Sequence, residues 1–213
     1  MSQAVLVIGE SGTGKSTSLR NLNPAETYII SVLNKPLPFK NKYTKTTPEK
    51  AGNFFVSDDF NKISSCIRYV NAKRPEIKNL VIDDWQYMMS NHFMRRSTER
   101  GFDKFTEIGK EGWRFIMEVN DCRDDLTCFV LAHSDKDMDG VARLKTIGKM
   151  LNEKVCLEGM FTIVLHSLIV DQEYKFMTQG DGTHIAKSPM NMFERLIDND
   201  LAKVKQSIEG YYK

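Results

Sequence analysis

The sequence predicts an α/β fold, with a mostly parallel sheet flanked by helices. Short apolar runs rich in β-branched residues alternate with longer segments of helical periodicity, which is typical of strands joined by crossover helices. A glycine-rich loop follows the first apolar run, and a pair of aspartates follows a later one. In a parallel sheet the residues that follow the strands gather at one edge, so both features are expected there.

The expected elements of the first two thirds of the chain follow from this alternation. A strand ends at the first glycine of the loop, and a helix begins at its lysine. Asp58 or Asp59 is expected to cap the next helix, which Pro75 stops. The predicted strands are 5–8, 28–33, 54–56, 80–82 and 128–132, and the predicted helices are 15–22, 59–73, 85–97 and 105–122.

The pattern changes after His133, where the chain becomes polar, charged and punctuated by glycine. This composition predicts a mobile loop, followed by two further strands and an amphipathic helix. We therefore expect one domain, 1–213, with a β-rich C-terminal extension of its sheet. Its parts are a core at 1–134, a mobile loop at 135–150, and C-terminal strands (160–170 and 173–178) and a tail helix (199–211) within 151–213.

The overall composition excludes few classes of partner. The net charge is +2 and the pI about 8.3, so any basic surface must be local. Apolar residues make up 41% of the chain, enough for a core, but no apolar run approaches the roughly 18 residues of a membrane span. The N-terminus does not resemble a signal peptide. We expect a cytoplasmic protein without a membrane partner, in the host cytoplasm if it is viral.

The glycine-rich loop matches G-x-x-x-x-G-K-[ST] at Gly9, Gly14, Lys15 and Ser16, the motif of a phosphate-binding loop. Glycines permit backbone angles that let amide hydrogens surround phosphate oxygens at a helix N-terminus. Lys15 is expected to bridge the β- and γ-phosphates, and the Ser16 hydroxyl to bind Mg²⁺. The predicted ligands are ATP and Mg²⁺, and the predicted nucleotide-binding residues are Gly9, Glu10, Ser11, Gly12, Thr13, Gly14, Lys15, Ser16 and Thr17.

Asp83 and Asp84 follow the predicted strand 80–82. Asp83 is expected to hold the metal together with Ser16, through a water molecule. Asp84 is the nearest acid that could orient or deprotonate an attacking water, although it could instead cap the helix that follows. His133 ends another strand and could sense the γ-phosphate; the alternative is a partly exposed loop histidine.

With these residues placed, the chain resembles the phage-encoded RecA-like ATPases, some of which are single-strand annealing recombinases. The resemblance is carried by "VLVIGESGTGKSTSL", "YIISVLNKPLPF", "LVIDDWQYMM", "FVLAHS" and "YKFMTQGDGTHIAKSP". It implies a RecA-like phosphate-loop fold, ATP hydrolysis, and self-association into a ring or filament with nucleotide between neighbouring subunits. It also implies that a basic residue reaches the neighbour's γ-phosphate. Lys187 matches that position, and Arg95 or Arg96 could serve instead.

One departure from this family concerns the residue that activates water. RecA itself carries a glutamate just after its second strand, whereas "SVLNKPLPF" contains no acid. Catalysis then relies on Asp84, or is slow, or is absent.

Two basic stretches are candidates for DNA contact. Arg95, Arg96 and Arg100 lie beside Phe93 and Phe102 in the first. Basic side chains would neutralise phosphates and aromatic rings would stack on bases. Both stretches also contain acids, and aromatics at helical spacing more often face a core. The second stretch contributes Arg143, Lys145 and Lys149.

The leading interpretation is an oligomeric, Mg-dependent ATPase that acts on single-stranded DNA in phage recombination or replication, with a single-strand binding protein as an expected partner. The alternatives are a nucleoside or nucleotide kinase and a module that binds ATP as a switch and hardly hydrolyses it. Fold alone does not separate these classes.

Overall fold

The computed structural model describes residues 3–212 except 48, 149–150 and 152–153. Within these residues nine strands form one sheet, in the order β3-β2-β4-β5-β1-β7-β8-β9, and β6 pairs with β5. The pairs from β3 to β7 are parallel, whereas β6, β8 and β9 pair in the antiparallel sense. The strands are β1 (Gln3–Gly9), β2 (Thr27–Ser31), β3 (Phe54–Val56), β4 (Asn79–Asp83), β5 (Thr127–Lys136), β6 (Ala142–Leu144), β7 (Ile163–Val170), β8 (Glu173–Met177) and β9 (Leu196–Asp198).

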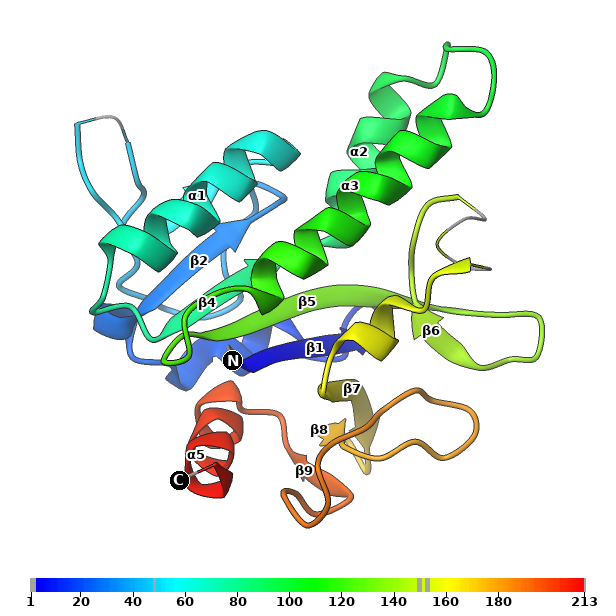
Figure 1. Ribbon diagram of the computed structural model, residues 1–213. Coiled ribbons are helices and arrows are strands. Elements are labelled where there is room, and N and C mark those ends of the chain that lie inside the picture. The colour runs from blue at the N-terminus through cyan, green and yellow to red at the C-terminus, as the bar shows by residue number, and fades with distance from the viewer. Residues whose placement is uncertain (1–2, 48, 149–150, 152–153, 213) are drawn as a thin grey trace.

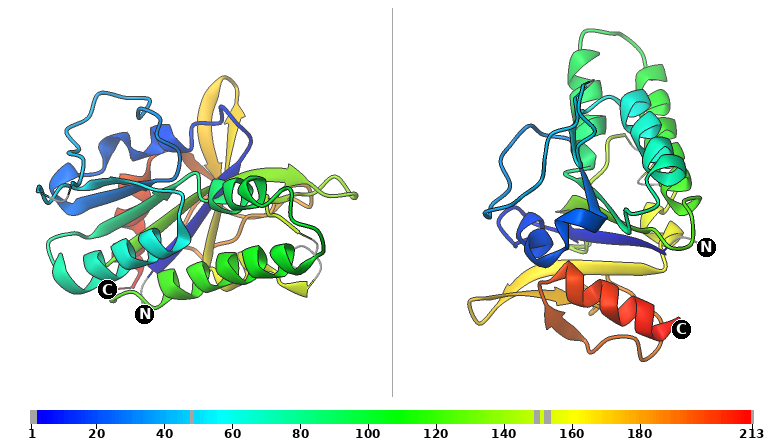
Figure 2. Two further views of the ribbon diagram at one scale, coloured as in Figure 1. Left: turned by 90° about the horizontal axis from the view of Figure 1, so that it is seen from above. Right: turned by 90° about the vertical axis from the view of Figure 1, so that its left-hand side faces the viewer.

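Helices cover both faces of the sheet, as Figures 1 and 2 show. The helices α1 (Phe60–Lys73), α2 (Gln86–Arg95) and α3 (Asp103–Asn120) pack on one face, and α5 (Leu201–Tyr211) packs on the other beside the 3₁₀ helix η1 (Ser16–Asn21). Short 3₁₀ turns lie at η2 (Pro24–Glu26) and η3 (Leu157–Met160). The predicted α/β fold with a mostly parallel, helix-flanked sheet is therefore confirmed. Among the described helices, none is long and apolar enough to cross a bilayer.

Strand β1 lies in the interior of the sheet, between β5 and β7. Its residues Ala4–Gly9 are buried, and successive side chains enter opposite cores. Leu6 and Ile8 pack with α1, α2 and α3, whereas Val5 and Val7 pack with η1 and α5. Burial on both faces explains why this strand is a continuous apolar run rather than an alternating one.

Two helix N-termini carry acidic caps, of which the sequence predicts only the first. Asp59 accepts a hydrogen bond from the Lys62 amide at the start of α1, so Asp59 rather than Asp58 is the cap. Asp200 accepts from the Ala202 amide at the start of α5. Each side chain satisfies an amide that has no partner within its own helix.

Two predicted segments differ from the structure. The helix expected at 15–22 is the shorter 3₁₀ helix η1, because Leu22 turns to extended backbone and Pro24 starts the next turn. The mobile loop expected at 135–150 is largely a β-hairpin, because β5 continues to Lys136 and pairs with β6. The Asp137 carboxylate closes the turn by accepting from the amides of Asp139 and Val141. Residues 149–150 of that prediction lie outside the described residues.

The boundaries of the C-terminal elements also shift. The strand expected at 160–170 begins at Ile163, after η3. Strand β9 was not expected, and it pairs with β8 before the tail helix begins at Leu201. The C-terminal extension thus adds β7, β8 and β9 to the sheet on the side of β1 that faces away from β4.

Candidate functional site

The glycine-rich loop turns sharply after β1. Gly12 and Gly14 have φ of 85° and 89°, the left-handed region that favours glycine. A Cβ on Gly14 would lie 2.9 Å from Cδ1 of Tyr174, and a Cβ on Gly9 would lie 2.5 Å from the Ser167 carbonyl oxygen. The loop is therefore shaped both by backbone angles and by the close approach of β7 and β8.

A cleft of about 420 Å³ opens beside this loop, at the carboxyl edge of the parallel strands. Residues that the sequence places far apart line it. Its walls consist of Ser11, Gly12, Gly14, Lys15, Ser16 and Thr17 of the loop and the start of η1, Lys35, Pro36 and Pro38 after β2, Asp83 at the end of β4, Asp84 directly after it, His133 of β5, and Tyr174 of β8. The structure thus brings Lys15, Ser16, Asp83, Asp84 and His133 together, as the sequence predicts.

Lys15 is folded back onto the loop that carries it. Its Nζ donates to the carbonyl oxygens of Gly9 (2.9 Å) and Glu10 (2.7 Å). Only 7% of the residue is exposed, and burial lowers the pKa of its ammonium to about 8, against the opposing charges of Asp84 and Asp83. An ammonium has three donors, so a third hydrogen bond is available for a ligand in the cleft.

Ser16 and Asp83 form the link between the loop and β4. The Ser16 hydroxyl donates to Oδ1 of Asp83 at 2.9 Å, across 67 residues of sequence. Asp83 is 3% exposed, and burial, followed by the charge of Asp84, raises its pKa to about 6. A buried carboxylate beside a hydroxyl offers the oxygen ligands that Mg²⁺ prefers, and a bound cation would compensate the buried charge that raises the pKa of this carboxyl.

No cluster of three or more His, Cys, Asp or Glu side chains suited to a metal occurs among the described residues. Mg²⁺ is commonly held by one or two carboxylates together with substrate phosphates rather than by a full set of protein ligands. Ser16 and Asp83 therefore fit a metal that arrives with a nucleotide, and they do not fit a resident metal centre.

Asp84 has an unusual backbone conformation for a buried residue. Its φ is 65°, a left-handed angle that aspartate tolerates better than most side chains, and it is 4% exposed. Its carboxylate forms an ion pair with Lys35 and lies 3.5 Å from Nε2 of His133. Burial alone would raise the pKa of this carboxyl, but the contacts with His133 and Lys35 outweigh burial and lower it.

The alternative role for Asp84, as the cap of the next helix, is wrong. Helix α2 begins at Gln86, its N-cap is Trp85, and no side chain caps it. The Asp84 carboxylate faces Lys35 and His133 instead. His133 is oriented by its backbone amide, which donates to Oε1 of Gln86 at 3.0 Å, and by an edge-on contact with Tyr87.

Lys35 is a site residue that sequence reasoning missed. It follows β2, which pairs with β4 in parallel, so it emerges at the same sheet edge as Asp83 and Asp84. Pro36 and Pro38 restrict the backbone on its C-terminal side. Asp84 raises the pKa of Lys35 against the opposing effect of burial. A lysine directly after a predicted strand was the available signal.

On its other side the loop is held by hydrogen bonds. The Ser167 hydroxyl of β7 donates to the Thr13 carbonyl oxygen at 2.6 Å and accepts from Nδ2 of Asn199 at 3.2 Å. Arg20 of η1 donates to the Asn199 carbonyl oxygen at 2.7 Å. None of these contacts was expected from the sequence, because they join residues as far as 179 positions apart.

Lys187 does not line the cleft. Its backbone pairs with Val164 of β7, donating and accepting at 2.9 and 2.8 Å, and its side chain forms no ion pair with a described residue. The chain by itself thus leaves Lys187 apart from Asp84. Its expected role on a neighbouring subunit stays a prediction.

The predicted DNA-binding arginines are mostly neutralised within the chain. Arg95 pairs with Asp58, and Arg96 with Glu99 and Glu107. Arg143 pairs with Asp137, and Lys145 with Asp135. Arg100 is exposed and has no ion pair among the described residues, and Lys149 lies outside them. None of these side chains lines the cleft beside the glycine loop.

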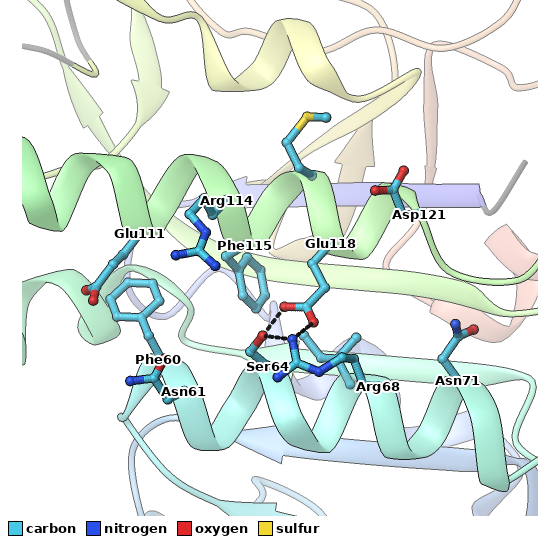
Figure 3. A pocket seen from close by; sticks show the side chains of 12 residues that line it. Phe60, Asn61, Ser64, Arg68, Asn71, Glu111, Arg114, Phe115, Glu118 and Asp121 are labelled. Carbon is cyan, nitrogen blue, oxygen red and sulfur yellow. Dashed lines mark hydrogen bonds and ion pairs between the residues drawn. The ribbon is translucent and has the colours of Figure 1, made fainter.

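A second cavity, of about 400 Å³, lies between α1 and α3. Figure 3 shows Glu118 reaching from α3 to Ser64 and Arg68 of α1. The Arg68 guanidinium donates to Glu118 at 2.9 Å, so the charges in the middle of this groove are paired. This groove lies between two helices and holds none of the predicted site residues.

A further cavity of about 620 Å³ holds Arg143 and Lys145 but no residue predicted to bind nucleotide or metal. The cleft at the glycine loop, which holds Lys15, Ser16 and Asp83, is therefore the candidate site.

Comparison of the sequence with family models and with curated proteins gives no match. The functional conclusion therefore depends on the site itself.

Proposed function

We propose that this chain binds ATP together with Mg²⁺ in the cleft beside the glycine loop and hydrolyses it. The observation that carries the proposal is the convergence of Lys15, Ser16, Asp83 and Asp84. The sequence separates the loop from the aspartates by 67 residues, yet Ser16 and Asp83 are in hydrogen-bond contact. A glycine loop with a lysine, a hydroxyl and a buried carboxylate supplies the parts that phosphoryl transfer requires.

Each part of the loop has a distinct role in this proposal. The amides of residues 10–16 and the Lys15 ammonium bind phosphate oxygens, with Lys15 using the donor that its two carbonyl contacts leave free. Ser16 and Asp83 would hold Mg²⁺, which neutralises charge on the phosphates when it is bound. Tyr174 presents a half-exposed ring beside Gly14, on the side of the loop opposite the aspartates.

Asp84 accepts the proton of the attacking water. His133 and Lys35 position the Asp84 carboxylate. In the structure Lys35 neutralises Asp84. A terminal phosphate that enters the cleft offers Lys35 a second anionic partner. If the Lys35 ammonium then pairs with that phosphate, the Asp84 carboxylate is freed from its ion pair. Lys35 is thus proposed to couple the presence of the terminal phosphate to the availability of the base.

We further propose that the chain is a RecA-like ATPase of the phage type, assembling into a ring or filament on single-stranded DNA, with a single-strand binding protein as a possible partner. The motifs shared with that family and the mostly parallel sheet support this by analogy. Lys187, or else Arg95 or Arg96, would then reach a neighbour's cleft and make hydrolysis depend on assembly. The ion pairs of Arg95 and Arg96 favour Lys187 of the three.

One observation favours a second candidate, an ATP-binding switch that hardly hydrolyses. The Lys35 ion pair lowers the pKa of Asp84, and a carboxylate with a lowered pKa is a weaker base. In that case ATP would order the segment that carries Lys35 without being consumed.

The test measures ATP binding and hydrolysis across protein concentration, with and without single-stranded DNA. We expect turnover to rise with both, and Lys15→Ala to remove tight ATP binding. Lys110→Ala, at an exposed position on α3, is the control and should leave binding unchanged. Unchanged binding in Lys15→Ala would refute the ATP site, whereas binding without turnover would select the switch.

The role of Lys187 has a separate test. Lys187→Ala should keep ATP affinity and lose turnover, and mixing it with Asp84→Ala should restore part of the activity at interfaces that pair one intact copy of each residue. No recovery on mixing would remove the support for action on a neighbouring subunit.

A further inference from the structure

The segment 34–50, between β2 and β3, is the most basic part of the chain, and we call it the lysine segment (Figure 1, the light-blue loop that passes beside β2). It holds five lysines and one acid, Glu49, for a net charge of +4. Because the whole chain carries +2, all other residues together carry −2. The net positive charge of the chain is therefore concentrated in this one segment.

Most lysines of this segment are free to bind an external anion, in contrast to the arginines discussed above. Lys40, Lys42, Lys45 and Lys50 are exposed, and none forms an ion pair with a described residue. Lys35 alone is paired, to Asp84 in the cleft. Unpaired lysines can neutralise the phosphates of a nucleic acid, and release of the cations condensed on that polyanion drives binding.

The segment also forms a groove of about 510 Å³ rather than a smooth charged surface. Lys35, Lys40 and Lys45 line it together with the rings of Phe39, Tyr43 and Phe54. Phe39 and Tyr43 are half-buried and pack against the core on the α5 side of the sheet. Each ring therefore has support behind it and takes part in the wall of an open groove.

The groove is held in place by β3, at the edge of the sheet. The Thr46 amide donates to the Phe54 carbonyl oxygen (2.8 Å), and the amides of Asn53 and Phe54 donate to the Thr44 carbonyl oxygen (2.9 and 3.0 Å). A Cβ on Gly52 would lie 2.2 Å from that same Thr44 oxygen, so the backbones at Thr44 and Gly52 are in close contact. A segment anchored in this way loses little further entropy on binding.

We infer that the lysine segment, and not the arginine-bearing stretches, is the surface that binds single-stranded nucleic acid. Exposed lysines would neutralise phosphates while bases stack on the supported rings. An acidic protein segment would use the lysines but has no need for the aromatic wall, and a duplex would hide its base faces. The choice of occupant rests on the proposed function, and Lys35 and Pro36 line both this groove and the ATP cleft.

The test uses a fluorescent oligo(dT) of about 20 nucleotides, longer than the roughly 4–16 that one small domain covers. The variant Lys40→Gln/Lys42→Gln/Lys45→Gln spares Lys35 and the ATP cleft. The control Lys62→Gln/Lys73→Gln/Lys110→Gln removes the same charge from exposed lysines of α1 and α3 that are also unpaired among the described residues. Anisotropy titrations at several salt concentrations give affinity and the slope of log K against log salt.

We expect the first variant to lose about ten-fold or more in affinity at low salt, and its slope to fall by about 2, from roughly 0.7 per lost phosphate contact. The control should keep the wild-type slope. Equal losses of affinity in both variants would mean that only net charge matters and would overturn the inference. Failure of the wild-type protein to bind oligo(dT), or binding of polyglutamate as tight as that of oligo(dT), would also overturn it.

A second variant addresses the rings. Phe39→Leu keeps an apolar side chain against the core and should weaken oligo(dT) binding about five-fold without changing the salt slope, because stacking is lost and no charge is. Unchanged affinity, or a duplex bound as tightly as oligo(dT), would overturn the stacking part. ATP binding measured on the same samples separates the two proposals: a chain that binds oligo(dT) through these lysines but not ATP would refute the ATPase alone.

Discussion

The glycine loop is held on its two sides by different chemistry. On the charged flank, formed by Lys35, Asp83, Asp84 and His133, the two carboxylates are buried side by side, and that of Asp84 contacts the half-exposed Lys35 and the partly buried His133. On the hydrogen-bonded flank, formed by Ser167, Tyr174 and Asn199, the contacts are neutral. Hydrogen bonds join Thr13, Ser167 and Asn199, and Oδ1 of Asn199 is buried without a partner among the described residues. Buried charge without full compensation lowers stability, whereas satisfied hydrogen bonds raise it. Under the proposed function the charged flank serves the ligand, whereas the other flank holds the loop in place.

The largest expected effect on this comparison comes from Asp83→Asn. The variant keeps an oxygen that can accept from Ser16 but removes a buried charge whose pKa is raised to about 6. Without ligand at pH 7.5 it should be more stable than wild type by about 2 kcal/mol, while Mg-dependent ATP turnover falls about 100-fold. Thermal unfolding and a turnover assay test the two parts. A variant that is less stable and fully active would contradict both.

The next effect concerns His166, the titratable group beside the hydrogen-bonded flank. Burial, followed by the nearby His184, lowers its pKa to about 4, and Asp181 and Lys15 also face it. The native protein therefore binds this proton more weakly than the unfolded chain, whose value is near 6.5. The stability from neutral His166 is present above pH 6.5 and is lost as the pH falls toward 4.

Between pH 7 and pH 5 the wild type should therefore lose about 2 kcal/mol more stability than His166→Gln does. Urea unfolding at the two pH values measures the difference. Equal losses in the two proteins would show that His166 contributes no pH dependence.

Lys35 tests whether the charged flank responds to the terminal phosphate. Lys35→Met should reduce the preference for ATP over ADP about ten-fold, because a charge-assisted hydrogen bond to that phosphate is lost. Lys35→Arg should keep most of the preference, and Lys62→Met on α1 is the control. Competition binding with the two nucleotides measures the ratio, and an unchanged ratio in Lys35→Met would remove Lys35 from the proposed mechanism.

The smallest effect is expected on the hydrogen-bonded flank. Ser167→Ala removes the bond to the Thr13 carbonyl oxygen and should lower stability by about 1 kcal/mol and ATP affinity about three-fold. Ser64→Ala, in the groove between α1 and α3, removes a hydrogen bond to Glu118 and controls for stability loss alone. If both variants change ATP affinity equally, the flank has no special relation to the loop.

The sequence predicts the fold to the extent that its elements are locally encoded. The apolar runs of β1, β4 and β5 require burial on both faces, and the glycines of the loop have the φ angles that their side-chain-free backbone permits. The helix after the loop was overestimated because Pro24 ends it early. The hairpin of β5 and β6 is not predicted from the sequence. Its turn is closed by Asp137, and a charged residue in a polar stretch is typical of a solvated loop.

The sequence predicts those parts of the site that lie at the carboxyl ends of neighbouring parallel strands, because these ends meet at one edge of the sheet. Asp83 and Ser16 meet because both follow parallel strands, and His133 joins them from β5, which lies between β1 and β4. The ion pair of Lys35 with Asp84 and the bond from Ser167 to Thr13 depend on strand order and on side-chain direction, which local patterns do not encode.

The bond from Ser167 to the Thr13 carbonyl oxygen has a mechanical consequence. It ties the tip of the loop to the start of the β7–β8 hairpin, whose other strand places Tyr174 against Gly14. The hairpin and the loop are therefore joined at two places. Under the proposed function, a partner that contacts the exposed Ile169 and Tyr174 is expected to shift the loop backbone and so to change ATP affinity.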